Sequence, residues 1–239
     1  MTELLYQTDS YLQEFDASVV SVLSEERAVV LDRTAFYPGG GGQPCDLGSL
    51  NIAELIYPVE KVKKQGDDVL HFLGGTVPLP SAGSASRGTL DWARRHKLMR
   101  THTALHVLCG TVFRDYGAQV TGGDMEPLKG RMDFEFETMR GDLVREIEIA
   151  VNKEVAMARE IRVKILPREE AFQIPDLIRT KINLLPEGIL QVRTVEIVGL
   201  DLQADGGTHV RNTNEVGIIR VVDYKSKGAI NKRIYIEIE

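Results

Sequence analysis

The sequence is poor in cysteine and lacks long apolar runs, and both absences narrow the class of protein. Its 239 residues include only Cys45 and Cys109, which stand far apart without cysteine neighbours. Neither a disulfide framework nor a Cys-x-x-Cys metal site is therefore expected. No run reaches the roughly 18 apolar residues of a membrane-spanning helix, and the N-terminal segment carries acids where a signal peptide carries basic residues. A soluble protein of the reducing cytoplasm is expected.

An excess of positive charge and tracts of low complexity are absent as well. The formal net charge of -6 argues against indiscriminate binding of polyanions, although it leaves room for a local basic patch. With 43% hydrophobic residues and no biased tract, the chain should fold into one large domain or two modest ones.

The first part of the chain is expected to be rich in strands. Residues 18–23, 27–31 and 71–77 are β-prone runs, and the glycines of 39–42 interrupt the pattern. The stretch 77–88 is rich in Pro, Gly and Ser, so we expect a turn or a linker there. We place a domain boundary near residue 90.

The second part is expected to mix helices and strands. Apolar residues recur at helical spacing over 92–116 and 141–159, which predicts two amphipathic helices. A short helical turn after Pro167 and β-prone segments follow, at 190–198, 216–224 and 233–238. The expected fold class of residues 91–239 is α+β.

Three of the five histidines form a candidate metal site. His102 and His106 stand at i and i+4 on the first predicted helix, where they face the same side and can chelate one ion. His209 ends the loop Asp205-Gly-Gly-Thr-His, whose glycines permit a tight turn that brings Asp205 and His209 together. Two packing histidines would explain the helical pair alone, but the full set favours a zinc site of a hydrolase.

These motifs and their flanks resemble the AlaX family, the free-standing relatives of the alanyl-tRNA synthetase editing domain. The resemblance is to its medium-length members, in which a His-x-x-x-His helix and a Cys-x-x-x-His loop bind zinc. The matching flanks occur in the same order, at 91–95, 131–134 and 212–217. The resemblance implies a small β-barrel-like domain at 1–90 and an α+β editing domain at 91–239, with an antiparallel sheet and a metal-binding helix.

One position departs from the family pattern. Asp205 stands where the family usually shows cysteine, and a carboxylate is a harder ligand that still binds zinc. Asp205 is thus either a fourth ligand or a partner that orients a histidine while water completes the coordination.

A glycine-rich motif in the first domain also matches the family. It begins at Thr34 and includes Gly41, Gly42 and Gln43. The resemblance implies that this loop reaches the editing pocket and that Thr34 tells serine from alanine. Without the resemblance, the glycines would merely form a tight turn and Thr34 would pack in the core.

The resemblance implies hydrolysis of the ester that joins a wrong amino acid to the alanine-specific tRNA. Serine is the main expected target and glycine a second one, whereas Ala-tRNA is spared. The expected catalyst is a metal-bound water rather than a side-chain nucleophile, and Cys109 is expected in the core. A zinc-dependent esterase for another acyl substrate and a non-catalytic tRNA-binding module are the alternatives.

Contacts to tRNA are expected from two groups of basic residues, rather than contacts to DNA or membranes. One group lies near the C-terminus and the other ahead of the metal-binding helix: Lys225, Lys227, Lys232, Arg233, Arg94 and Arg95. Such clusters of charge often belong to an ordinary solvent-exposed surface. Here their closeness in sequence to the metal-binding motifs favours a role in binding RNA. The oligomeric state is left open.

Overall fold

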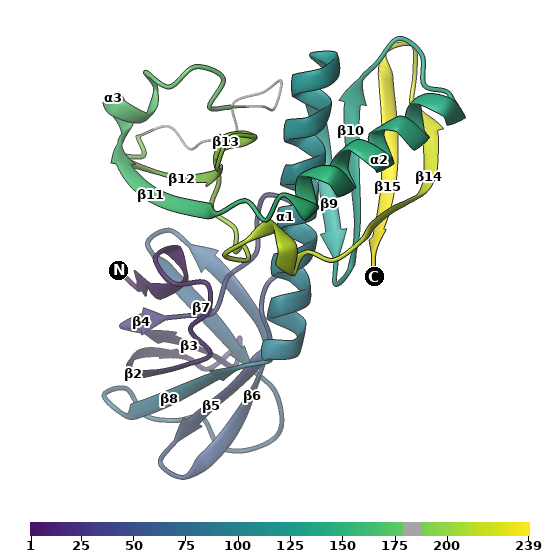
Figure 1. Ribbon diagram of the computed structural model, residues 1–239. Coiled ribbons are helices and arrows are strands. Elements are labelled where there is room, and N and C mark those ends of the chain that lie inside the picture. Colours follow the sequence, from purple (N-terminus) through teal and green to yellow (C-terminus); the bar gives the residue numbers. More distant parts are fainter. Residues whose placement is uncertain (179–187) are drawn as a thin grey trace. The chain divides into compact units, whose positions relative to one another are not determined.

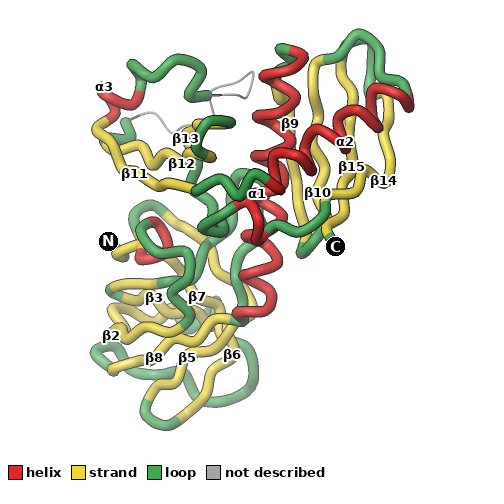
Figure 2. The backbone as a smooth tube through the Cα atoms, viewed as in Figure 1, coloured by secondary structure: helices red, strands yellow, loops and turns green. Residues whose placement is uncertain are grey.

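The computed structural model describes residues 1–178 and 188–239, and it contains two compact units. Unit 1 comprises Met1–His96 and unit 2 comprises Lys97–Glu239. Figures 1 and 2 show a β-rich unit 1 and a mixed unit 2, so the predicted α+β class is confirmed. The assignment of separate functions to 1–90 and 91–239 remains a prediction.

Unit 1 is built on a closed antiparallel barrel, as the β-barrel-like prediction requires. Its strand order is β2-β3-β7-β6-β5-β8, with β8 returning to β2. The strands are β2 (Glu14–Leu23), β3 (Ala28–Leu31), β5 (Gly48–Ile52), β6 (Leu55–Gln65), β7 (Asp68–Leu73) and β8 (Ala85–Leu90). Along β2 the side chains of Phe15, Ala17 and Val19 point inward and alternate with exposed residues, because successive strand residues face opposite sides. Outside the barrel, η1 (Leu5–Gln7) follows β1 (Glu3–Leu4), which pairs in parallel with β4 (Arg33–Thr34).

The expected linker at 77–88 is wrong in its second half. Residues 85–88 belong to β8, which pairs with β2 on one side and β5 on the other and thereby closes the barrel. Small residues make the sequence of this strand look like a turn, but in the structure they leave room for neighbouring side chains. A Cβ at Gly88 would overlap the ring of Phe15, so the aromatic side chain fills the space that the glycine leaves.

Unit 2 contains a four-stranded antiparallel sheet in the order β14-β15-β10-β9. Its strands are β9 (Val120–Glu126), β10 (Lys129–Glu135), β14 (Ile219–Ser226) and β15 (Asn231–Ile238). Helix α2 (Gly141–Ala156) crosses one face of this sheet in Figure 1 and packs on β14. The helix ends three residues before the predicted end, because Ala158 adopts a positive φ of 51° that no α-helix continues through.

Helix α1 (Trp92–Tyr116) has the bounds that the sequence predicts. Gly117, with a φ of 66°, supplies the stop. The helix packs on β10, where Gly130 leaves room for the side chain of Leu105. Leu98, Leu108 and their neighbours are buried, so α1 lies in the core of unit 2 along most of its length.

A second antiparallel sheet of unit 2 carries the loop with His209. It has the order β11-β12-β13, with β11 (Ile161–Pro167), β12 (Gln191–Ile197) and β13 (Asp201–Ala204). The short helix α3 (Arg168–Ala171) follows β11, as predicted after Pro167, and η2 (Thr213–Glu215) follows the histidine loop. Over residues 1–178 and 188–239, none of the helices is both long and apolar enough to cross a membrane.

Candidate metal centre

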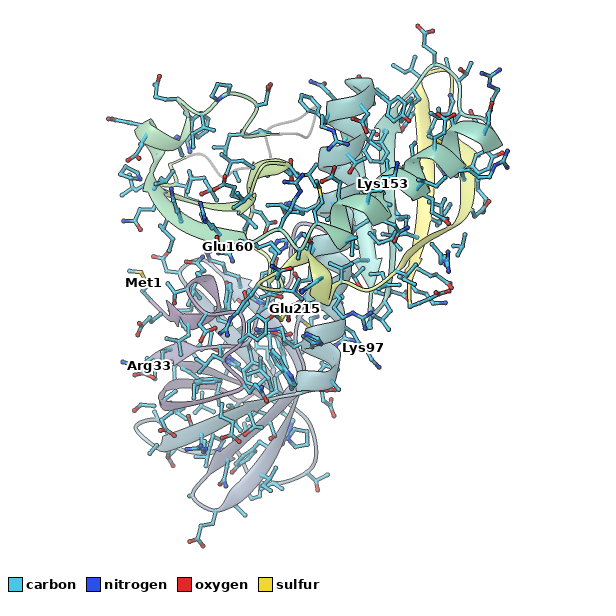
Figure 3. All side chains as sticks on the ribbon, in the orientation of Figure 1. Met1, Arg33, Lys97, Lys153, Glu160 and Glu215 are labelled. Carbon is cyan, nitrogen blue, oxygen red and sulfur yellow. The ribbon has the colours of Figure 1, made fainter. Side chains whose placement is uncertain are left out.

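Helix α1 and the loop after β13 bring four potential ligands together in unit 2. His102, His106, Asp205 and His209 each offer a ligand atom, and these atoms lie within 4.8 Å of one another. The imidazole rings are close, with centroids of His102 and His209 4.2 Å apart. Lys97, which Figure 3 labels on α1, is exposed, whereas His102, five residues further along the helix, is buried. The predicted set is therefore a cluster of three buried histidines and a partly buried Asp205.

Thr103 helps to hold the histidine loop against α1. Its hydroxyl oxygen lies 3.2 Å from Nδ1 of His209 and accepts the backbone N–H of Val210 at 3.3 Å. Because Nδ1 is engaged by Thr103, Nε2 of His209 faces the carboxylate of Asp205, at 3.0 Å from Oδ2. The helix that carries two histidines thus also sets the orientation of the third.

Asp205 lies at the centre of the cluster. Its Oδ1 is 3.5 Å from Nε2 of His102, and its Oδ2 accepts the N–H of Gly207 at 2.8 Å. Nη1 of Arg193 donates to the Asp205 carbonyl at 2.9 Å and lies 3.6 Å from Oδ2. Burial alone opposes ionisation, but His102 and His209 hold the pKa of Asp205 well below its ordinary value. The side chain is therefore a carboxylate, the form that ligates metals.

The histidines differ in their ionisation. Burial lowers the pKa of His102 well below its ordinary value and that of His209 to about 4. Burial also acts to lower the pKa of His106. The adjacent carboxylates of Asp201 and Asp205 outweigh this effect, so the pKa of His106 is raised. His102 and His209 are thus neutral imidazoles near pH 7, which is the state that binds a metal.

The donor set fits a divalent metal of intermediate softness. It offers imidazole nitrogens and one carboxylate oxygen, which suit zinc better than the all-oxygen sets of calcium or magnesium. Zinc would be held by the donor atoms of these four residues, which lie within 4.8 Å of one another before any ion is bound. The cluster can therefore hold a metal.

The glycine-rich motif forms a tight turn in unit 1. Gly40 and Gln43 exchange backbone hydrogen bonds of 3.0 and 2.9 Å, and Gly39, Gly40, Gly41 and Gly42 all have positive φ. Gly41 is exposed, Gly42 is half-buried and Gln43 is buried. Only glycine adopts this run of left-handed conformations without strain.

Thr34 is buried at the end of β4. Its Oγ1 lies 2.8 Å from Nε2 of His71 and accepts the backbone N–H of Phe36 at 3.1 Å. The structure thus gives Thr34 a defined hydrogen-bonding geometry inside unit 1. Its role in recognising serine remains a prediction.

The structure corrects two of the expected tRNA contacts. Arg95 is fully buried and donates to the carboxylate of Asp46 and the carbonyl of Ala35, so its guanidinium is committed within unit 1. Lys232 is also buried, and its Nζ donates to the carbonyls of Gly228 and Ala229, both at 2.8 Å. Both charges stabilise their own unit, and neither faces solvent.

The other basic candidates differ in their exposure. Arg233 is largely buried and donates to both oxygens of Asp133, and half-buried Arg94 reaches the carbonyl of Cys45 at 3.4 Å. Lys225, near the end of β14, and Lys227, in the turn between β14 and β15, are exposed. Their contact with tRNA remains a prediction.

Sequence reasoning missed two charged residues at the cluster. Arg193 comes from β12, and Asp201 from β13 lies 3.2 Å from His106, measured from Oδ2 to Nδ1. Asp201 carried a weak signal, since it stands four residues before Asp205 in the same motif. Arg193 carried none, because its closeness depends on the pairing of β12 with β13.

Comparisons with known proteins identify the relatives of this chain. Residues 192–235 match the family model described as the threonyl and alanyl tRNA synthetase second additional domain, and residues 7–94 match that of the class II (A) tRNA synthetases. The alanyl-tRNA editing protein AlaX-M of Saccharolobus solfataricus is 39% identical over 239 residues, and that of Methanosarcina acetivorans 38% over 241. Each alignment covers 98% of both chains.

A longer relative matches as well. The alanine-tRNA ligase of Ignicoccus hospitalis is 38% identical over 227 residues, which are 92% of this chain but only 24% of the ligase. The chain thus matches about a quarter of the ligase and nearly the full length of the AlaX-M proteins. It belongs to the family of alanyl-tRNA editing proteins, with relatives of the AlaX-M type.

Proposed function

We propose that this chain hydrolyses the ester bond of mischarged alanine-specific tRNA. Serine is the main amino acid removed and glycine a second one, while Ala-tRNA is spared. The observation that carries the proposal is a buried cluster of three histidines and one carboxylate, in a chain whose full-length relatives are named alanyl-tRNA editing proteins. Such editing is needed because a small synthetase pocket rejects a near-isostere with an extra hydroxyl only weakly.

We further propose that the cluster binds zinc through His102, His106 and His209, with Asp205 as the fourth group. The neutral, buried imidazoles of His102 and His209 and the ionised carboxylate of Asp205 support this ligand set. When bound, zinc supplies a Lewis acid that can activate water or polarise the ester carbonyl. Cys109 is buried on α1 beside the side chain of Gln203, which supports a reaction without a thiol nucleophile.

The proposal gives Thr34 the role of recognising serine through its hydroxyl oxygen. Nδ1 of His71 lies 3.3 Å from the carbonyl of Val29, so this nitrogen carries the hydrogen and Nε2 accepts the Thr34 hydroxyl hydrogen. The N–H of Phe36 occupies one lone pair of Oγ1, and a hydroxyl oxygen has two. The remaining lone pair would accept the serine hydroxyl, a group that alanine lacks.

The proposal includes tRNA as the partner and the cytoplasm as the place of action. Exposed Lys225 and Lys227 are suited to contact phosphates, because they offer positive charge at the surface, at the end of β14 and just after it. No contribution to RNA binding is assigned to buried Arg95 or Lys232.

The decisive experiment measures amino acid release from Ser-tRNA, Gly-tRNA and Ala-tRNA, all carried on the alanine-specific tRNA. Chelator-sensitive release of serine, restored by zinc and lost in His106→Ala, is expected. A Thr34→Val variant should bind zinc normally but lose most of its preference for serine over alanine. If a zinc-loaded protein releases none of the three amino acids, the editing proposal is wrong and another acyl substrate or a binding role applies.

A further inference from the structure

We propose that Asp201 positions His106 for metal binding, as a carboxylate that contacts the histidine and not the metal. The inference rests on the proposed metal centre and extends it to a residue outside the ligand set. Among the described residues, the group whose ligand atoms lie within 4.8 Å of one another consists of His102, His106, Asp205 and His209, without Asp201.

The contact between Asp201 and His106 selects one ring nitrogen for the metal. Oδ2 of Asp201 lies 3.2 Å from Nδ1 of His106, a close contact in which the two groups are not aligned as a hydrogen bond, and the Asp201 side chain has no exposed surface. Since Nδ1 faces this carboxylate, Nε2 is the nitrogen left to face the other ligands. Histidines that bind metals usually donate their second ring N–H to a carboxylate, a carbonyl or water, which fixes the ring and raises its basicity.

A glycine in α1 makes the close approach of Asp201 possible. Gly110 stands one helical turn after His106, and a Cβ at that position would lie 2.8 Å from Cβ of Asp201 and 3.0 Å from Cγ of Leu200. Glycine in a helix interior is less favourable than alanine, so its presence calls for a packing reason. The approach of β13 to the helix supplies that reason and brings the carboxylate to His106.

The side chain of Gln203 holds the carboxylate in place. Its Nε2 donates to Oδ2 of Asp201 at 2.6 Å and lies 3.3 Å from Sγ of Cys109 on α1. Gln203 therefore ties the carboxylate of β13 to the same helix that carries His106. Gln203 and Asp201 are thus connected to the proposed metal ligands through His106.

The test compares the zinc affinity of the full chain with that of two variants, by competition with a chromophoric chelator. Asp201→Ala should weaken zinc binding by about 10- to 100-fold, as is typical when such a partner is removed. Gly110→Ala improves helix propensity but pushes the carboxylate away from His106, so it should also weaken zinc binding. The absorption spectrum of the cobalt-substituted protein should change in both variants.

A matched control uses a carboxylate of unit 2 that does not contact the histidines. Asp133 is buried and paired with Arg233, so Asp133→Asn should lower stability without changing zinc affinity. If Asp201→Ala does not fold, Gly110→Ala decides the question. Wild-type affinity and an unchanged cobalt spectrum in the folded variants would overturn the role of Asp201, whereas absence of zinc binding by the wild type would overturn the metal centre itself.

Discussion

Oγ1 of Thr34 lies 2.8 Å from Nε2 of His71, and both side chains are buried in unit 1. The ring of His71 also packs edge-on against Phe36, with centroids 5.5 Å apart. Burial lowers the pKa of His71 to about 4, so its imidazole is neutral near pH 7. A neutral ring inside the barrel therefore orients the hydroxyl that we propose for serine recognition.

The lowered pKa of His71 predicts a pH-dependent stability. Between the folded pKa of about 4 and the unfolded value of 6.5, the unfolded chain binds a proton that the folded chain does not. The free energy of unfolding should therefore fall as the pH falls through this window, by up to about 3 kcal/mol from this residue. Urea unfolding at several pH values should show that the free energy of unfolding depends less on pH in His71→Gln than in the wild type. The same pH dependence in both proteins would contradict the prediction.

The ion pair of Arg95 and Asp46 should dominate the stability of unit 1. Both side chains are almost fully buried, so Arg95→Met leaves a carboxylate without its counter-charge. The expected decrease is about 3 to 5 kcal/mol in the free energy of unfolding. Arg94→Met is the matched control, because that side chain is only half-buried, and it should cost less than about 1 kcal/mol. Similar decreases in the two variants would count against a structural role for Arg95.

Substitutions of Asp205 should separate its two proposed roles. If its carboxylate is a ligand, Asp205→Cys retains tight zinc binding, because a thiolate replaces the donor, whereas Asp205→Ala weakens it. We expect this result, since both carboxylate oxygens face histidines of the cluster. Cobalt substitution of Asp205→Cys should add a sulfur-to-metal charge-transfer band. Its absence, together with equally weakened affinity in both variants, would instead indicate that Asp205 only orients a histidine.

Charge reversal of Lys225 and Lys227 should weaken the binding of the tRNA substrate. The double variant to Glu should raise the apparent KM, and the slope of log KM against log salt should decrease by roughly one unit for each phosphate that the variant no longer neutralises. Lys63→Glu on β6 is a control, because this residue is also exposed but not part of the predicted RNA contact. Identical kinetics in the double variant and the control would rule out the contact.

Local patterns were sufficient to predict several elements and the cluster. Apolar residues at helical spacing and Gly117 predicted both ends of α1, because helix formation and termination depend on nearby residues. The i, i+4 spacing of His102 and His106 predicted a common face, since that spacing is close to one helical turn. The glycine pair after Asp205 likewise predicted the turn that brings it to His209.

Long-range packing decided what these patterns left open. Strand β8 looks like a linker in sequence, and it becomes a strand because β2 and β5 supply its hydrogen bonds and Phe15 fills the space over Gly88. Arg95 looks like a surface charge, yet Asp46 compensates it in the interior. Asp201 approaches His106 only because β13 packs against α1 at Gly110. Residue type and spacing thus determined the helix and its histidine pair, whereas the closed barrel, the buried charges and the surroundings of the histidine cluster depend on contacts between distant segments.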